Sequence, residues 1–357
     1  MTKNHKNYLE LAFQLAETNL GKTGLNPSVG CVIVKNNTVL SSGVTSLNGR
    51  PHSEFNALNK LKGCSGASLY TTMEPCTHYG KTPPCVNIII KKKIKKVFYG
   101  FEDPDIRTFQ KAKKILKKKG IKTKLLFSRK NRYFYDSYFL NKKKAIPFVS
   151  AKIAISSDYQ TINKKKKWIT SNLSRKVVHL IRNKFDCIIS TSKSINFDNS
   201  LLNCRISGLD NHKPDLFIID LKLNLRKKLK LNNLLKKRKT HIITLIKNRK
   251  KSNIFKKLGY KIIFVKNLKD KKDLNLLYKK IYKMGYSRML VESGLTFLNF
   301  LITNKVLNEL YIFKSKNKLG KYGNNNNTSK YVKKIFPKLP LININNDQLV
   351  TKRFNNV

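Results

Sequence analysis

The segment T-M-E-P-C-T-H-Y-G-K-T-P-P-C, residues 72–85, decides how the first half of this sequence folds. Cys76 follows one proline and Cys85 follows two, and eight residues separate the thiols. Upstream, His52-Ser53-Glu54 adds an imidazole and a carboxylate. One imidazole and two thiolates can hold Zn²⁺ with the fourth position open to water, which is typical of catalytic zinc sites. The pattern therefore predicts a zinc site with His52, Cys76 and Cys85 as ligands.

The remaining carboxylate, Glu54, lies two residues after the first ligand. Zinc lowers the pKa of a bound water, and a nearby carboxylate that does not bind the metal can carry protons to a leaving group. We predict that Glu54 has this catalytic role. Zinc-dependent nucleobase deaminases combine H-x-E with P-C-x-x-C. Here the first motif fits, whereas eight residues instead of two lie between the cysteines.

The long cysteine spacing resembles that of the bifunctional riboflavin-biosynthesis deaminase–reductase family. N-P-S-V-G-C-V-I-V at 26–34 is similar to another segment of that family, and Asp103-Pro104 fits its next loop. The turn D-I-R-T at 105–108 departs from the glycine-rich turn usual there. The resemblance implies a cytidine-deaminase-like domain that removes the ring amine from a phosphorylated pyrimidine, 2,5-diamino-6-ribosylamino-4(3H)-pyrimidinone 5′-phosphate.

Hydrophobic periodicity predicts alternating helices and strands in this half. The predicted helices are 8–20, 54–61, 83–90, 109–119 and 129–140, and the predicted strands are 29–34, 38–43, 68–72, 96–101 and 121–127. This order is typical of a three-layer α/β domain. A basic run at 142–144 before Pro147 marks a boundary. We therefore expect a zinc-dependent deaminase domain over residues 1–145 and a second domain over 146–357.

The second half alternates again. Its predicted strands are 148–155, 187–190, 216–220, 241–246, 261–265 and 289–292. It contains no G-x-G-x-x-G, the common dinucleotide-binding fingerprint. Instead, V-E-S-G-L-T-F-L at 291–298 leads from a strand through Gly294 into a helix, whose N-terminus could bind a phosphate.

Several motifs here are similar to the reductase half of the same family, namely P-F-V at 147–149, K-I-A at 152–154, W-I-T-S at 168–171, V-E-S-G at 291–294 and L-G at 319–320. The resemblance implies a dihydrofolate-reductase-like α/β domain that uses NADPH to reduce a ribosyl group to ribityl. The residues that it places at the cofactor are Ala154, Trp168, Thr170, Ser194, Asp198 and Gly294. Those that it places at the substrate are Lys152, Arg182, Leu202, Arg205 and Glu292, with the arginines pairing with phosphate and Lys152 close to hydride transfer.

The composition excludes some other classes of protein. The chain has 357 residues, 40% of them hydrophobic, which is enough for two cores. No run of about 18 apolar residues predicts a membrane span, and six cysteines without framework spacing favour a reducing cytoplasm. The net charge of +56 suggests nucleic acid, yet lysines occur in nearly every connection, and Lys, Asn and Ile have A/T-rich codons. We expect no specific nucleic acid, no membrane, and association with further copies of the chain.

Two other functions fit parts of the sequence. The second domain could be only a structural or oligomerising partner of a deaminase, although Lys152, Asp198, Arg205 and Glu292 argue against this. An RNA-directed deaminase is favoured by the charge, and opposed by the long cysteine spacing and the second α/β domain. The residues after 335 predict no recognisable element.

Overall fold

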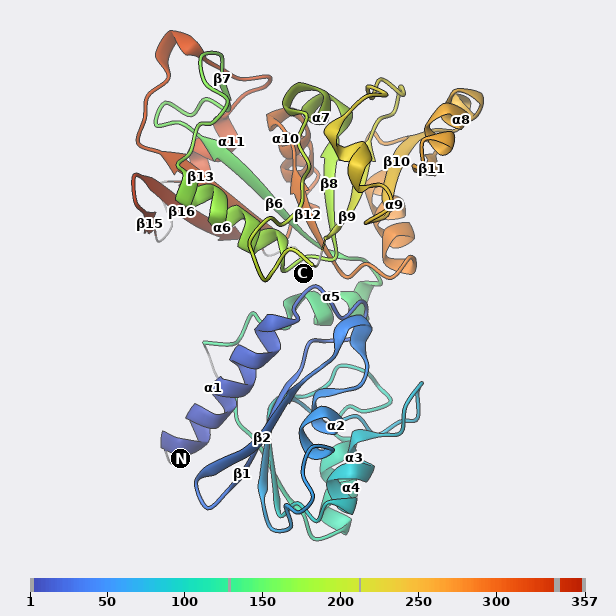
Figure 1. The fold of residues 1–357 in the computed structure, drawn as a ribbon, viewed down its shortest axis with the longest axis vertical. Helices are drawn as coiled ribbons and strands as arrows, with labels where there is room; N and C mark the ends of the chain where they lie inside the picture. Colours follow the sequence, from blue (N-terminus) through green and yellow to red (C-terminus); the bar gives the residue numbers. More distant parts are fainter. Residues whose placement is uncertain (1–2, 128–129, 212, 337–340, 355–357) are drawn as a thin grey trace. The chain divides into compact units, whose positions relative to one another are not determined.

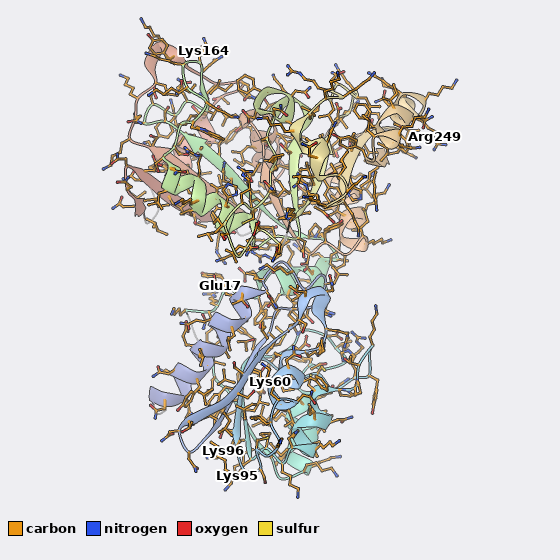
Figure 2. All side chains as sticks on the ribbon, viewed as in Figure 1. Glu17, Lys60, Lys95, Lys96, Lys164 and Arg249 are labelled. Carbon is orange, nitrogen blue, oxygen red and sulfur yellow. The ribbon has the colours of Figure 1, made fainter. Side chains whose placement is uncertain are left out.

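The computed structural model describes residues 3–127, 130–211, 213–336 and 341–354. The chain forms two compact units, Met1–Ala145 and Ile146–Val357, and each is an α/β structure (Figure 1). Within the described ranges, no helix is both long and apolar enough to span a bilayer. Basic side chains project from separate elements of both units, for example Lys60, Lys95 and Lys96 in the first and Lys164 and Arg249 in the second (Figure 2).

The first unit is built on one mixed five-stranded sheet in the order β2-β1-β3-β4-β5. Its elements are α1 (Lys3–Thr18), β1 (Gly30–Lys35), β2 (Thr38–Val44), α2 (Ser53–Leu58), β3 (Ser68–Met73), α3 (Cys85–Lys91), β4 (Lys96–Phe101), α4 (Lys111–Lys118), β5 (Lys122–Leu125) and α5 (Asp136–Lys144). β1 pairs antiparallel with β2 and β3, whereas β3, β4 and β5 are parallel.

Alternation along β1 shows why helices cover both faces of this sheet. Cys31 and Ile33 pack with residues of α2, α3 and α4, and Val32 and Val34 pack with residues of α1 and α5. All four side chains are buried. A strand that is apolar on both faces needs a cover on each side, so the predicted three-layer arrangement is confirmed.

Two glycines allow the helices to approach the sheet closely. A Cβ on Gly30 would lie 1.8 Å from the carbonyl oxygen of Ala12 in α1. A Cβ on Gly43 would lie 2.4 Å from the carbonyl oxygen of Ser53, in the first turn of α2. Both contacts are with backbone atoms, so neither position tolerates a side chain without moving a helix. Gly43 therefore fixes the start of α2, beside the predicted zinc ligand His52.

The predicted helix 129–140 is wrong in its extent. Residues 130–135 form turns and α5 begins only at Asp136, while positions 128–129 lie outside the described residues. The basic run 142–144, expected in a connection, is the last turn of α5. Cations at a helix C-terminus interact favourably with the helix dipole, which explains why this run extends the helix.

The second unit is built on a nine-stranded sheet in the order β11-β10-β9-β8-β12-β6-β13-β16-β15, which is parallel from β11 to β13. The strands of this sheet are β6 (Phe148–Ile155), β8 (Cys187–Thr191), β9 (Asp215–Ile219), β10 (Thr240–Leu245), β11 (Lys261–Val265), β12 (Arg288–Glu292), β13 (Glu309–Ser315), β15 (Ile342–Ile344) and β16 (Asp347–Arg353). Two short strands of the same unit, β7 (Ile162–Asn163) and β14 (Gly323–Asn324), form a separate two-stranded sheet. The helices of the second unit are α6 (Asn172–Arg182), α7 (Ser192–Asp198), α8 (Arg249–Lys257), α9 (Lys271–Lys283), α10 (Leu295–Thr303) and α11 (Lys330–Ile335).

Helices cover both faces of this sheet too. The core residues of α9, α10 and α11 pack with one set of strand positions, such as Ile189 and Ile243. Residues of α7 and α8 pack with the alternate positions, such as Ile188 and Ile242. All six strands predicted for this half are present within one or two residues of their expected ends.

The end of the chain belongs to the sheet, although its sequence predicts no element. β16 pairs antiparallel with both β13 and β15. Asp347, at the start of β16, is buried and accepts hydrogen bonds from the Ser171 backbone N–H (2.7 Å) and the Ser174 hydroxyl (2.6 Å). The strand therefore helps to hold the start of α6.

Candidate active sites

The predicted zinc ligands come together in the first unit. Cys76 lies in the loop after β3, Cys85 is the first residue of α3, and His52 is the N-cap of α2. The His52 Nδ1 atom lies 3.5 Å from the Cys76 sulfur and 3.4 Å from the Cys85 sulfur. The three donor atoms all lie within 4.8 Å of one another. One nitrogen and two sulfurs at this separation fit Zn²⁺ with a fourth position left for water.

The surroundings of the two thiols shift their pKa values in opposite directions. The neighbouring Cys85 thiol and the His52 imidazole donate to the Cys76 sulfur, which lowers the pKa of Cys76 well below that of a free thiol. The backbone N–H of Cys85 also donates to the Cys76 sulfur, at 3.2 Å. These hydrogen bonds therefore favour the thiolate form of Cys76 in the absence of a metal ion.

Glu54 lies beside this cluster and is almost fully buried, with 4% of its surface exposed. Burial raises the pKa of its carboxyl group, and the Cys76 thiolate adds to that effect. Ser53 donates a hydrogen bond to the Glu54 Oε2 atom (3.0 Å). A carboxyl group with a raised pKa can both accept and return a proton, as general acid–base catalysis requires.

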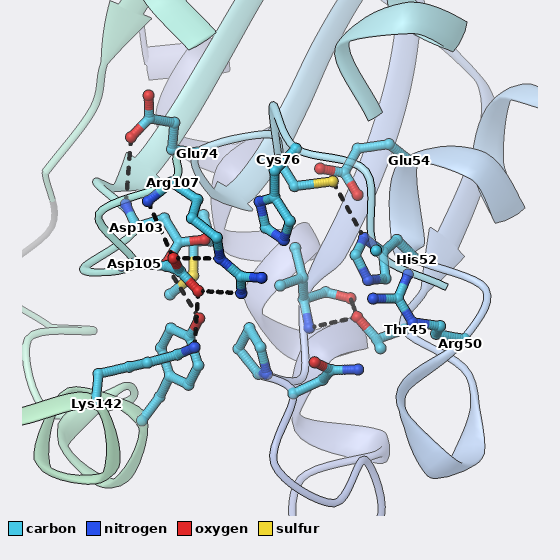
Figure 3. Close-up of a pocket in the computed structure, with 17 residues that line it drawn as sticks. Thr45, Arg50, His52, Glu54, Glu74, Cys76, Asp103, Asp105, Arg107 and Lys142 are labelled. Atoms are coloured by element: carbon cyan, nitrogen blue, oxygen red, sulfur yellow. Dashed lines mark hydrogen bonds and ion pairs between the residues drawn. The ribbon is translucent and has the colours of Figure 1, made fainter. Parts of the chain in front are cut away.

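His52, Glu54 and Cys76 line a cavity of about 110 Å³. Figure 3 shows His52, Glu54 and Cys76 on one side of this cavity, with Arg50 and Arg107 turned towards its interior. The other lining residues include Asn26, Val29, Thr45, Glu74, His78, Asp103, Asp105, Tyr138 and Lys142. His78, from the loop between the two cysteines, accordingly reaches the cavity.

Glu74 is a positioning residue that the sequence patterns did not reveal. It is buried, and its carboxylate accepts hydrogen bonds from the backbone N–H groups of Asp103 (3.3 Å), Gln110 (3.1 Å) and Ala112 (3.1 Å). Glu74 precedes the Pro75-Cys76 pair, so it ties the segment 103–112 to the metal loop. Its place in the T-M-E-P-C motif was the available signal.

Residues of the turn 105–108 form an ion cluster with Lys142 of α5. Arg107 donates from Nε and Nη2 to the Asp105 carboxylate at 2.9 and 2.6 Å, and Lys142 donates to the same carboxylate at 2.8 Å. The Arg107 guanidinium and then Lys142 hold the pKa of Asp105 well below its usual range. We call Asp105, Arg107 and Lys142 the pocket ion cluster.

In the second unit, Lys152 and Glu292 lie side by side at the centre of the sheet. They are register partners on β6 and β12, and the Lys152 Nζ atom is 3.4 Å from a Glu292 oxygen. Arg182, at the end of α6, donates to the two Glu292 oxygens at 2.5 and 3.0 Å. Burial alone would raise the pKa of Glu292, but the charges of Arg182 and Lys152 outweigh burial and lower the pKa to about 2. Glu292 is therefore ionised at neutral pH.

The two arginines predicted to bind substrate phosphate differ in how fully they are engaged. Arg182 is buried, and besides Glu292 it donates to the carbonyl oxygen of Asn203 at 3.0 Å. Arg205 donates from one amino group to the Asn203 side chain at 2.6 Å. Burial, followed by the charge of Arg182, lowers the pKa of Arg205. Among the described residues, Arg205 thus has more donors without a hydrogen-bond partner than Arg182 has.

A third arginine, which the sequence patterns did not reveal, supports the same loop. Arg238 is buried and donates to the carbonyl oxygens of Leu201 (2.5 Å), Leu202 (2.6 Å) and Pro214 (3.2 Å). Leu202, one of the predicted substrate residues, has a φ of 47°, in the left-handed region. A non-glycine residue keeps such a φ only where its surroundings hold it, and Arg238 provides that support. Only the fold reveals this role.

The predicted cofactor residues lie on four different elements. Ala154 is on β6, two residues after Lys152, and Ser194 and Asp198 are on α7. Burial raises the pKa of Asp198, opposed by the charges of Lys167 and Lys152. Thr170 and Trp168 precede α6, and the guanidinium carbon of Arg175 lies 4.8 Å from the centre of the Trp168 ring.

The turn at Gly294 has the features of a phosphate site. Gly294 is the N-cap of α10 and supplies no side-chain cap, so the first N–H groups of this helix face outward. A Cβ on Gly294 would lie 2.5 Å from the Asn326 Nδ2 atom. The Asn326 Oδ1 atom is buried and has no partner within the described residues. The N–H groups at this helix N-terminus are donors that suit a phosphate. Asn326 lies beside this turn, and its backbone carbonyl accepts a hydrogen bond from Thr296 at 3.3 Å.

The two units match different family models. Residues 2–101 match the cytidine and deoxycytidylate deaminase zinc-binding region, and residues 147–337 match the RibD C-terminal domain. Among solved structures, Acinetobacter baumannii RibD is similar with a TM-score of 0.81 at 24% identity, covering 98% of each chain. A deaminase/reductase from Thermotoga maritima has the same TM-score at 23% identity. These likenesses confirm the predicted folds.

Curated relatives match over nearly the whole chain. The riboflavin biosynthesis protein RibD of Buchnera aphidicola is 33% identical over 88% of both sequences. That of Aquifex aeolicus is 30% identical over 86% of both. The predicted cofactors, Zn²⁺ and NADPH, are those that the two matched domains imply. The chain therefore belongs to the RibD family of bifunctional riboflavin-biosynthesis enzymes, with a deaminase domain followed by a reductase domain.

Proposed function

We propose that the first unit catalyses zinc-dependent hydrolytic deamination of 2,5-diamino-6-ribosylamino-4(3H)-pyrimidinone 5′-phosphate. The observation that carries this proposal is the convergence of one nitrogen and two sulfur donors within 4.8 Å, beside the buried carboxyl group of Glu54. His52, Cys76 and Cys85 hold the ion. When bound there, Zn²⁺ supplies the charge that brings the pKa of a water close to about 7.

Glu54 then performs the proton transfers of the reaction. Its carboxylate takes a proton from the attacking water and delivers it to the departing ring amine, which leaves as ammonia. Its raised pKa makes the carboxylate a stronger base and so favours the first transfer. Glu74 takes no part in the proton transfers. Its hydrogen bonds hold the segment 103–112 at the edge of the same cavity.

Substitution of Glu54 tests this mechanism. The variant Glu54→Gln keeps the shape of the side chain and all three zinc donors, so it should bind zinc normally. Its rate of ammonia release should fall about 10²-fold or more, the usual scale for a positioned acid–base group. The control is Glu10→Gln, which changes a carboxylate paired with Lys130 on the surface. Normal ammonia release from Glu54→Gln would remove this residue from the mechanism.

We propose that the second unit reduces the ribosyl group of the deaminated product to ribityl. The supporting observation is that Lys152 on β6 pairs with Glu292 at the carboxyl end of β12, directly before the Gly294 turn. NADPH supplies the hydride when bound. The ionised Glu292 holds the Lys152 ammonium group in place, and Lys152 donates a hydrogen bond to the opening sugar.

The reductase can be tested separately from the deaminase. Purified protein is incubated with the deaminated intermediate and NADPH, and NADPH oxidation is followed together with the mass of the product. A product heavier by two hydrogen atoms supports reduction. If no NADPH is oxidised and none binds by titration, the second domain is only a structural partner. Self-association and the lack of a nucleic-acid role stay predictions.

A further inference from the structure

We propose that Arg107 is the anion-binding residue of the deaminase cavity and recognises the 5′-phosphate of the substrate. This inference rests on the proposed deaminase function and adds a residue that determines specificity. Arg107 lies in the turn 105–108, which is hydrogen-bonded to the metal loop.

The backbone around Arg107 is anchored directly to the metal loop. The Thr77 hydroxyl, next to Cys76, donates a hydrogen bond to the Arg107 carbonyl oxygen at 2.8 Å. His78 and the Thr108 hydroxyl form a second link at 3.1 Å. The Arg107 side chain lines the same cavity as His52 and Cys76 and points into it (Figure 3). A substrate whose ring lies at the metal would hold the rest of its structure within this cavity.

The Arg107 guanidinium group is held in place on one edge, and its other edge has hydrogen-bond donors for a ligand. Its Nε and Nη2 atoms bind the Asp105 carboxylate, and its side chain is 56% exposed. Within the part of the chain that the structure describes, its Nη1 group makes no hydrogen bond. An arginine held on one edge presents its other N–H groups in a fixed direction, a geometry suited to phosphate oxygens.

The charge of the pocket ion cluster favours an anion. One carboxylate, Asp105, is shared by two cations, Arg107 and Lys142, so the cluster carries one net positive charge. The nearby carboxylates already have donors. Glu74 accepts three backbone N–H groups, and Asp103 accepts from the Tyr138 hydroxyl (3.1 Å) and the Asp105 N–H (2.9 Å).

The two other cations of the cavity, Arg50 and Lys142, have different contacts. Arg50 donates to the Thr82 hydroxyl, which fixes the loop between the ligand cysteines. The Lys142 ammonium is bound to Asp105 and lies 5.4 Å from the centre of the Tyr138 ring. Within the described residues, Arg107 combines a side chain fixed by two hydrogen bonds to Asp105 with an exposed Nη1 group, and it is therefore the residue that we assign to the phosphate.

The test compares two substrates that differ only in the phosphate. For the phosphorylated compound, Arg107→Met should raise KM about ten- to a hundredfold with little change in kcat. For the dephosphorylated riboside, the same variant should behave like the wild-type protein. The matched control is Arg132→Met, which removes one exposed positive charge beside Tyr133. Zinc content should be normal in both variants.

Other outcomes would overturn the assignment. A selective rise of KM in Arg50→Met but not in Arg107→Met would place the phosphate at Arg50. An equal rise for both substrates in Arg107→Met would show that Arg107 only supports the turn. If the wild-type protein deaminates neither compound, the proposed deaminase function fails. Ribose 5-phosphate should still slow hydrogen exchange of residues 103–110 in an Arg205→Met background, and lack of protection there would refute the role of Arg107.

Discussion

Arg182 and Arg205 were predicted to share one role, yet their contacts give them different expected effects on stability. Removing one partner of a buried ion pair costs about 3–5 kcal/mol, because the other charge is left buried without compensation. In Arg182→Met, Glu292 keeps Lys152 at 3.4 Å, so we expect the lower end, about 3 kcal/mol. Arg205 makes one hydrogen bond to Asn203. Arg205→Met should therefore cost only about 1 kcal/mol.

The kinetic effects should separate in the opposite way. Arg205→Met removes free donors, so KM for the phosphorylated intermediate should rise about ten- to a hundredfold while NADPH affinity stays near normal. Arg182→Met should lower kcat instead, because the Glu292 carboxylate that binds Lys152 then loses the two Arg182 hydrogen bonds that orient it. Deamination is the internal control, since its residues lie in the other unit.

Two measurements decide between these roles. Urea unfolding with hydrogen exchange of β12 peptides gives the stability of the second unit, and NADPH oxidation with the deaminated intermediate gives kcat and KM. A double variant, Arg182→Met with Glu292→Gln, should be more stable than the sum of the single losses predicts, by about 1–3 kcal/mol. The reasoning fails if the two losses simply add, or if Arg182→Met keeps full stability and changes only KM.

Three further predictions concern single side chains. Cys85→Ser should lose the bound zinc, about one ion per chain, together with deamination, whereas Cys64→Ser, in the core of the same unit, should keep both, as metal analysis would show. Glu74→Gln should destabilise the first unit by about 2–3 kcal/mol in urea unfolding, because an amide nitrogen would face backbone N–H donors. Burial lowers the pKa of His241 from 6.5 to about 4. Between these pH values the imidazole is protonated in the unfolded chain but neutral in the folded chain. The free energy of unfolding of the second unit should therefore fall as the pH drops from 6.5 towards 4, by at most roughly 3 kcal/mol, and His241→Phe should remove that part of the pH dependence.

The zinc donors could be predicted from sequence because local structure places them. His52 is a helix N-cap, Cys85 opens the next helix after two prolines, and Cys76 follows a buried strand. Each position is set by a few neighbouring residues with strong turn or helix signals. The sheet then brings the three segments together, as its alternating pattern predicts.

The residues that the sequence did not predict depend on contacts between distant segments. Asp347 lies 173 positions after Ser174, whose hydroxyl it binds, and Arg238 lies 36 positions after Leu202. The strands β13 and β16 also escaped prediction, because their pairing joins segments separated by a helix and several turns. No local pattern records such a pairing.

In a chain as basic as this one, a buried acidic side chain indicates a structural or functional site. Among the residues that the structure describes, eight acidic side chains are buried but only two basic ones, although the sequence has 75 Lys and Arg against 19 Asp and Glu. A surface lysine costs little, because water and salt screen its charge. A buried carboxylate needs donors or cations to remain stable. Glu54, Glu74, Asp105 and Glu292 are all buried beside a proposed site, so in an acid-poor sequence the position of a carboxylate is informative in itself. On this ground, burial of a carboxylate in an acid-poor chain marks Glu74 and Asp105 as candidates for a structural or functional role.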